Sequence, residues 1–153
     1  MSGCPGSQTM DFNEKRDQKQ SETGQRQSQL RQWPIQMHLV SPQAPYFQER
    51  DVLFAADCVP FALADFHKDY LKGKSLAIAC PKLDSEQEIY SEKIKDLIDE
   101  SKINTLTVMI MKVPCCFGLV QVVKSGAENA TRKVPVKQVV VGIEGNVESE
   151  EWI

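Results

Sequence analysis

Apolar residues gather in short runs between residues 34 and 143, and more polar, helix-like stretches separate these runs. The run 103–111, INTLTVMIM, is β-branched and continuously apolar, which is typical of a strand that is buried on both faces. We predict further strands at the remaining apolar runs, which are 34–40, 51–57, 74–79 and 134–143.

Helical patterns lie between these strands. The clearest is 84–102, where Ser85 and Glu88 have the spacing of a capping box at the start of a helix. Its apolar positions fall on one face and predict core contacts: Ile89, Tyr90, Ile94, Leu97 and Ile98. We also predict helices over 59–73 and 117–133.

The alternation of strand and helix predicts an α/β fold with a parallel sheet covered by helices. We expect a small, doubly wound, mostly parallel sheet of the Rossmann-like or flavodoxin-like, three-layer kind, with right-handed crossovers.

Composition divides the chain into parts. Residues 1–32 are predicted to be a flexible, cysteine-containing N-terminal segment and linker, because 11–32 is Gln-rich and charged and has almost no apolar residues to bury. The α/β domain is expected over 33–147, and the acidic tail 148–153 is expected to be frayed.

The charge and the lengths of the apolar runs argue against several functional classes of protein. The net charge of −3 and the absence of a basic run argue against nucleic-acid binding. No apolar run is long enough for a membrane span, and no signal peptide is evident, so we expect a cytoplasmic protein. In a reducing compartment, five cysteines indicate metal or redox chemistry, or simply buried small residues, rather than a disulfide framework.

The cysteines follow the predicted strands. Cys58, Cys80 and the adjacent pair Cys115 and Cys116 each come directly after a strand. Because the carboxyl ends of parallel strands share one edge of the sheet, where such folds bind ligands, we expect these thiols to converge. The alternative is that these cysteines follow the strands by chance.

Four thiolates suit an iron–sulfur cluster or, as a lesser alternative, zinc. No CxxC motif is present, and one thiol per loop favours a wide guest over a single ion. We expect either Cys115 or Cys116 to be a ligand, with the other beside it, bridging or reactive. Their position at the start of a helix should favour the thiolate. Cys4 could complete a set of four if the linker folds back.

Other polar residues have plainer interpretations. His67 is expected at the helix surface, and His38 is expected to be a hydrogen-bonded, buried imidazole in its strand. Asp57 either caps the helix that follows or tunes the thiol site, and capping is the favoured alternative.

Taken together, SGCPGS, SQLRQWPIQMHLV, AADCVPFA, ACPKLD and VPCCFGL resemble the ferredoxin-type 4Fe-4S binding-domain proteins of anaerobic bacteria and archaea. The resemblance covers residues 2–10 and 28–147 and places all five cysteines on family motifs. Members typically carry an upstream module with two cluster motifs, so the chain resembles their downstream half. Lys112 stands where the family usually has an acidic residue, and it should make the site more cationic.

We therefore expect an iron–sulfur redox module that exchanges electrons with a partner protein or a separately encoded ferredoxin module. Two alternatives remain. One is a thiol-redox enzyme that uses Cys115 and Cys116 directly, and the other is a non-catalytic docking domain of a larger iron–sulfur protein.

Overall fold

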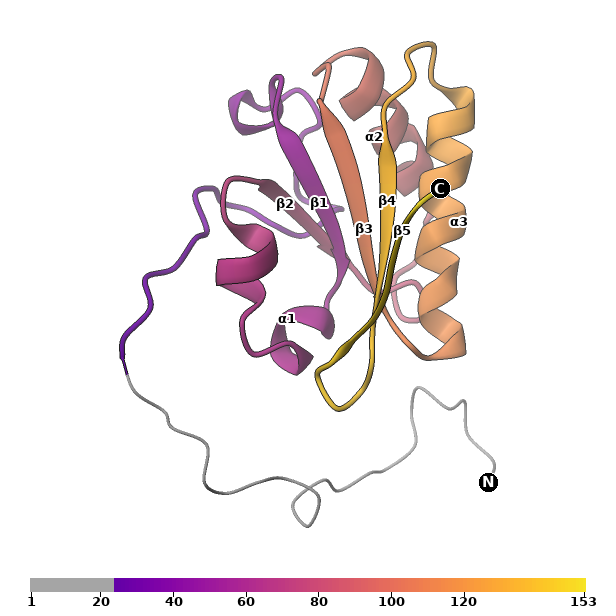
Figure 1. The fold of residues 1–153 in the computed structure, drawn as a ribbon. Coiled ribbons are helices and arrows are strands. Elements are labelled where there is room, and N and C mark those ends of the chain that lie inside the picture. The colour runs from indigo at the N-terminus through magenta and orange to yellow at the C-terminus, as the bar shows by residue number, and fades with distance from the viewer. Residues whose placement is uncertain (1–23) are drawn as a thin grey trace.

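A computed structural model of the chain describes residues 24–153. Its strands form one sheet in the order β2-β1-β3-β4-β5, in which β1 to β4 run parallel and β5 is antiparallel to β4 (Figure 1). The strands are β1 (Asp51–Ala56), β2 (Ser75–Ala79), β3 (Thr105–Met111), β4 (Val136–Val141) and β5 (Val147–Trp152). The predicted α/β fold with a mostly parallel sheet is confirmed.

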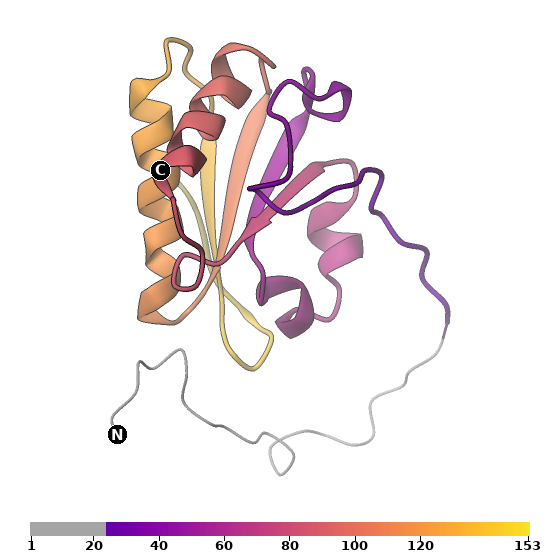
Figure 2. The same ribbon diagram turned by 180° about the vertical axis from the view of Figure 1, so that it is seen from behind.

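The helices cover the sheet from both sides. In Figures 1 and 2, α2 (Glu88–Asp99) and α3 (Phe117–Asn129) lie together against one face. The short α1 (Val59–Ala62) and the π-helical turn η4 (His67–Leu71) lie on the other side, beside β1 and β2. Within residues 24–153, none of the helices has the length and apolarity that crossing a membrane requires.

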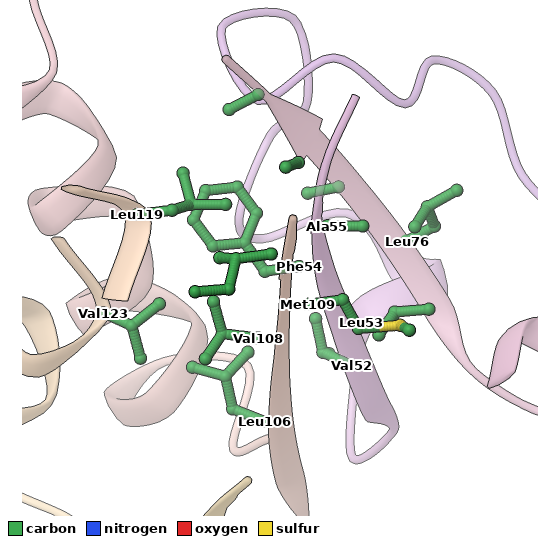
Figure 3. Packing of buried hydrophobic residues seen from close by; sticks show 14 of the residues in the cluster. Val52, Leu53, Phe54, Ala55, Leu76, Leu106, Val108, Met109, Leu119 and Val123 are labelled. Atoms are coloured by element: carbon green, nitrogen blue, oxygen red, sulfur yellow. The ribbon is translucent and has the colours of Figure 1, made fainter. Parts of the chain in front are cut away.

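Buried side chains pack on both faces of the sheet, and one part of this core forms between the sheet and α2 and α3. Figure 3 shows Leu119 and Val123 of α3 facing Leu106 and Val108 of β3. The two helices pack closely because Gly126 has no side chain: a Cβ there would lie 2.6 Å from the side chain of Ile94 on α2. The predicted core stripe of α2 is largely confirmed, with Tyr90, Ile94, Leu97 and Ile98 buried.

The helix predicted over 59–73 is interrupted. Leu63 has an extended backbone (φ −97°, ψ 106°) and ends α1, and the chain becomes helical again only in η4. The break lies against the turn after β4, where a Cβ on Gly145 would come 2.5 Å from the Ala62 carbonyl oxygen. Long-range packing therefore overrides the helical periodicity of this segment.

The predicted capping box of α2 is wrong. The helix begins after Gln87, and the N-cap makes no side-chain hydrogen bond to it. The Gln87 amide instead donates to the carbonyls of Pro81 and Asp84, at 2.6 and 2.9 Å, and the Ser85 carbonyl pairs with His38. The polar groups near this helix start are thus used to hold the loop before it.

The predicted strand over 34–40 is reduced to a single parallel bridge between Gln36 and Ile78. After Gln36 the chain turns, because the Gln36 carbonyl accepts the N–H groups of Leu39 and Val40 at 2.8 and 3.0 Å. The ladder on β2 therefore stops after one residue pair.

The prediction of a frayed acidic tail is also wrong, because residues 147–152 form edge strand β5. Its acidic side chains find partners across the strand pair: Lys137 of β4 lies 3.7 Å from the Glu150 carboxylate and 5.7 Å from the Trp152 ring centroid. Cross-strand pairs of this kind stabilise an otherwise exposed edge.

Candidate functional site: a thiol-lined cavity

The thiols meet where the strand order reverses. The chain passes from β1 to β2 on one side and then returns to place β3 on the other side of β1. Cys58 follows β1, Cys80 follows β2, and Cys115 and Cys116 lie in the 3-10 turn η5 (Pro114–Cys116) after β3. This is the switch point of a doubly wound sheet, which is the usual place for a ligand. It lies at the lower edge of the sheet in Figure 1.

All four of these cysteines line one cavity of about 850 Å³. The predicted convergence is therefore confirmed, whereas the role of the thiols as ligands stays a prediction. Cys58 is exposed, Cys80 and Cys115 are half-buried, and Cys116 is buried. Cys4 lies outside the described residues.

The rest of the lining is mostly apolar. Asp57 and Lys82 are the charged residues among the described residues that line it. Phe61 and Leu83 are 92% and 80% exposed, so two of the most exposed large apolar side chains in residues 24–153 lie at this cavity. The apolar part of the lining comprises Ala56, Phe61, Ala62, Pro81, Leu83, Met111, Val113 and Ile143.

Burial and neighbouring negative groups raise the pKa of two of the cavity thiols, those of Cys58 and Cys116. Burial raises the pKa of Cys58, with further contributions from the Asp57 carboxylate and the charges of Cys80 and Cys115. Burial also raises the pKa of Cys116 to about 11; a backbone hydrogen bond at Met111 opposes this, and Cys115 and Cys58 add to it. The expectation that the helix start lowers the pKa is wrong for Cys116, because burial outweighs the dipole.

Asp57 does not cap the helix. The N-cap position of α1 is Cys58, without a side-chain hydrogen bond, and the Cys58 thiol donates to the Asp57 carboxylate at 3.6 Å. Asp57 therefore acts on the thiol beside it, which was the less favoured of the two expectations.

The loop after β2 holds Cys80 through residues that the sequence did not single out. The Cys80 N–H donates to the Asp84 carboxylate at 3.0 Å, and the Leu83 N–H donates to the Cys80 sulfur at 3.4 Å. The Tyr90 hydroxyl also donates to the Asp84 carboxylate. An Asp four residues after the cysteine was the available signal, whereas Tyr90 was recognised only as a core residue.

The other candidates lie away from the cavity. His67 is exposed, as expected, and its Nδ1 accepts the Gln29 N–H at 3.0 Å. His38 is exposed rather than buried, because its segment turns away from β2; its ring lies 4.4 Å from that of Tyr90. Lys112 does not line the cavity. Its ammonium lies 3.5 Å from the Glu148 carboxylate of β5, which compensates the positive charge at the surface.

Within residues 24–153, no group of three or more His, Cys, Asp or Glu side chains is arranged to hold a single metal ion. The thiols thus share a cavity without forming a closed single-ion site. This arrangement bears on the kind of guest that they can accept.

Comparison with known proteins establishes the family. The chain is 31% identical over 120 residues to an uncharacterized protein of Archaeoglobus fulgidus, an alignment that covers 78% of this chain and 84% of that protein. No solved structure matches the chain. Residues 44–153, which include the whole sheet and all four cavity cysteines, match the Rossmann-like domain family, and the chain belongs to that family.

Proposed function

We propose that the thiol-lined cavity binds an iron–sulfur cluster of the 4Fe-4S type and that the protein exchanges electrons with a redox partner. The observation that carries the proposal is the convergence of Cys58, Cys80, Cys115 and Cys116 on one cavity at the switch point of the sheet. Cysteine thiolates are the usual ligands of such clusters.

The size and openness of the site favour a wide guest. The cavity of about 850 Å³ far exceeds the space of a single ion, and the thiols come from three separate loops. A zinc ion requires its ligands at about 2.0–2.3 Å, which the described side chains do not provide as they stand. Zinc remains the lesser alternative because it would need these loops to close.

The electrostatics of the cavity also support a cationic guest. Burial is the main cause of the raised pKa of the Cys58 and Cys116 thiols, and the neighbouring cysteines add to the shift in both. Thiolates that share one apolar cavity repel each other, so a bound cation would favour their formation. Metal binding of this kind releases protons and depends on pH.

Among the adjacent cysteines, Cys115 is the better ligand. Cys116 is 8% exposed and its pKa is raised to about 11, whereas Cys115 is half-buried and lies near enough to Cys58 to act on its charge. We therefore assign Cys58, Cys80 and Cys115 as ligands and Cys116 as the thiol beside them. Cys4 stays a candidate for a fourth position.

A bound cluster would supply one-electron redox chemistry. The chain itself holds the thiols beside apolar side chains and directs the Leu83 N–H to the Cys80 sulfur. Hydrogen bonds to the sulfurs and solvent exposure set the potential of such centres. The exposed Phe61 and Leu83 would give a redox partner or a ferredoxin module an apolar surface beside the site.

The thiol-redox alternative has one observation in its favour, which is the side-chain hydrogen bond between Cys115 and Cys116. The raised pKa of Cys116 opposes it, because the thiolate is the nucleophile. A docking domain without a redox centre would also use the exposed apolar side chains. It predicts that replacing the cysteines with serine leaves partner binding unchanged.

Iron and acid-labile sulfide analysis of the full chain, purified and reconstituted without oxygen, tests the proposal. We expect a brown protein with charge-transfer absorption, and loss of iron in Cys58→Ser and Cys80→Ser variants. The matched control is Glu150→Gln, because Glu150 lies on β5, away from the thiols. This variant should bind as much iron as the wild type. Zinc without sulfide would select the zinc alternative, and a colourless protein that cannot be reconstituted would overturn the proposal.

A further inference from the structure

The five residues from Cys80 to Asp84 form a closed turn, and its hydrogen bonds return to Cys80. The Cys80 N–H donates to the Asp84 carboxylate at 3.0 Å, and the Asp84 N–H donates to the Cys80 carbonyl at 2.9 Å. The Leu83 N–H completes the turn with a 3.4 Å contact to the Cys80 sulfur. The amide, carbonyl and sulfur of one cysteine are therefore all engaged within its own loop.

The Asp84 carboxylate is also held by a residue of the helix that follows the turn. It accepts the hydroxyl of Tyr90, a fully buried residue in the first turn of α2. The Tyr90 ring lies edge-on to Phe54 of β1, with ring centroids 6.4 Å apart. Asp84 thus connects the turn at Cys80 to a rigid helix and to the central part of the sheet.

Cys58 lacks a comparable support. Its thiol is exposed and donates to the Asp57 carboxylate, a hydrogen bond that a deprotonated sulfur cannot make. The Cys80 sulfur, in contrast, accepts a hydrogen bond from a backbone N–H, which remains favourable when the sulfur carries a negative charge or binds a metal. Of these two sulfurs, that of Cys80 is already arranged as a ligand would be.

We propose that Asp84 is the positioning residue of the thiol cavity, which holds the Cys80 sulfur toward Cys58 through the hydrogen-bonded turn and its bond to Tyr90. The inference deepens the proposed function and rests on it for the identity of the guest. The predicted placement of the Cys80 sulfur beside Cys58 does not depend on a guest, so it can be tested on the metal-free protein.

The test uses dibromobimane, which bridges two neighbouring thiols, on the reduced, metal-free full chain. The amount of peptide bridged between Cys58 and Cys80 is measured by mass spectrometry. Bridging depends on the effective concentration of one thiol at the other, so a loosened turn should lower the yield about threefold or more. We expect this loss in Asp84→Ala.

Rescue and control variants separate positioning from general destabilisation. Asp84→Asn keeps an oxygen that accepts both donors and should retain most of the bridged product. Tyr90→Phe removes one of the two bonds and should give an intermediate yield. Asp99→Ala is the matched control, because that carboxylate also accepts backbone N–H groups, from Thr131 and Arg132, but at the far end of α2.

The proposal is overturned if Asp84→Ala bridges as well as the wild type, if Asp99→Ala loses as much product as Asp84→Ala, or if the wild type forms no Cys58–Cys80 bridge. Iron analysis separates the two claims. A wild type that binds no iron but loses bridging on Asp84→Ala refutes the cluster and supports the positioning role. Normal iron loading with unchanged bridging in Asp84→Ala refutes the positioning role alone.

Discussion

Two cavities of this protein lie at opposite ends of the same sheet and differ in how their charged groups are compensated. One, of about 540 Å³, lies by the amino ends of β1, β3 and β4 and includes Lys137, Tyr70 and Glu150 in its lining. There the Tyr70 hydroxyl donates to Glu150 at 2.5 Å, and Lys137 lies 3.7 Å from the same carboxylate. The thiol-lined cavity at the carboxyl ends instead gathers groups that all become negative when they ionise, apart from Lys82.

The difference indicates in which of the two cavities a cationic guest would be favoured. In the first cavity, the Glu150 carboxylate is compensated by the Tyr70 hydroxyl and by Lys137. In the thiol-lined cavity, Cys58 and Cys116 have raised pKa values because burial and neighbouring negative groups act in the same direction. A cation beside these sulfurs would favour their thiolate forms, which is the electrostatic basis of the proposed cluster.

The largest expected effect comes from removing the guest from the thiol-lined cavity. A ligand that binds only the folded state stabilises it, so the reconstituted protein should unfold at a temperature roughly 5–10 °C above the metal-free protein. Cys58→Ser/Cys80→Ser should abolish this difference while the far-ultraviolet circular dichroism stays unchanged. Thermal unfolding under anaerobic conditions measures it, and an equal stabilisation of the double variant would contradict it.

A smaller effect is expected in the thiol chemistry of the metal-free protein. Burial raises the pKa of Cys116 to about 11, so at pH 8 its thiolate is about a hundredfold scarcer than that of an ordinary thiol. Cys116 should therefore be alkylated by iodoacetamide about a hundredfold more slowly than a denatured control peptide, and faster as the pH rises toward 11. Peptide mass spectrometry gives the rate; alkylation at the speed of the peptide would restore the thiol-redox alternative.

Breaking the compensated cavity should change stability without touching the thiols. Glu150→Ala removes the hydrogen bond from Tyr70 and the pairing with Lys137, and it should lower the free energy of unfolding by about 1 kcal/mol. Urea unfolding measures this loss. The Cys58–Cys80 bridging yield and the iron content should not change, and a loss of iron in this variant would show that the two cavities are coupled.

The smallest expected effect concerns Asp99, a paired carboxylate outside both cavities. Backbone N–H groups of Arg132 and Thr131 lower its pKa below the ordinary value. A carboxylate with a lowered folded-state pKa stabilises the protein above the unfolded pKa, and this stability is lost as the pH falls through the folded-state value. The wild type should thus lose stability relative to Asp99→Asn below about pH 4, as seen in unfolding curves from pH 6 to pH 2; parallel curves would contradict the assignment.

The sequence predicted the parts of the molecule that local patterns determine. Continuous apolar runs marked β1 to β4, and the cysteines directly after them marked the edge where the thiols converge, because parallel strands place their carboxyl ends together. The fold class followed from these runs and the helical patterns between them, and the candidate site followed from the positions of the cysteines.

What the sequence did not predict depends on long-range packing. β5 is acidic and reads as a tail, and it becomes a strand only because β4 offers partners such as Lys137. Asp84 is held beside Cys80 partly by Tyr90 of the following helix, whose hydroxyl donates to the Asp84 carboxylate. The helix start at Cys116 was expected to favour the thiolate, but the depth of burial that reverses this effect is a property of the folded core.

The central claim is that Cys58, Cys80 and Cys115 enclose one inorganic guest. Site-resolved alkylation of the anaerobically reconstituted protein, compared with the same protein after chelation, tests it most directly. We expect these three thiols to be protected together when iron and sulfide are present and to become reactive together when iron and sulfide are removed. Iron and sulfide bound while all three thiols remain as reactive as in the chelated protein would contradict it.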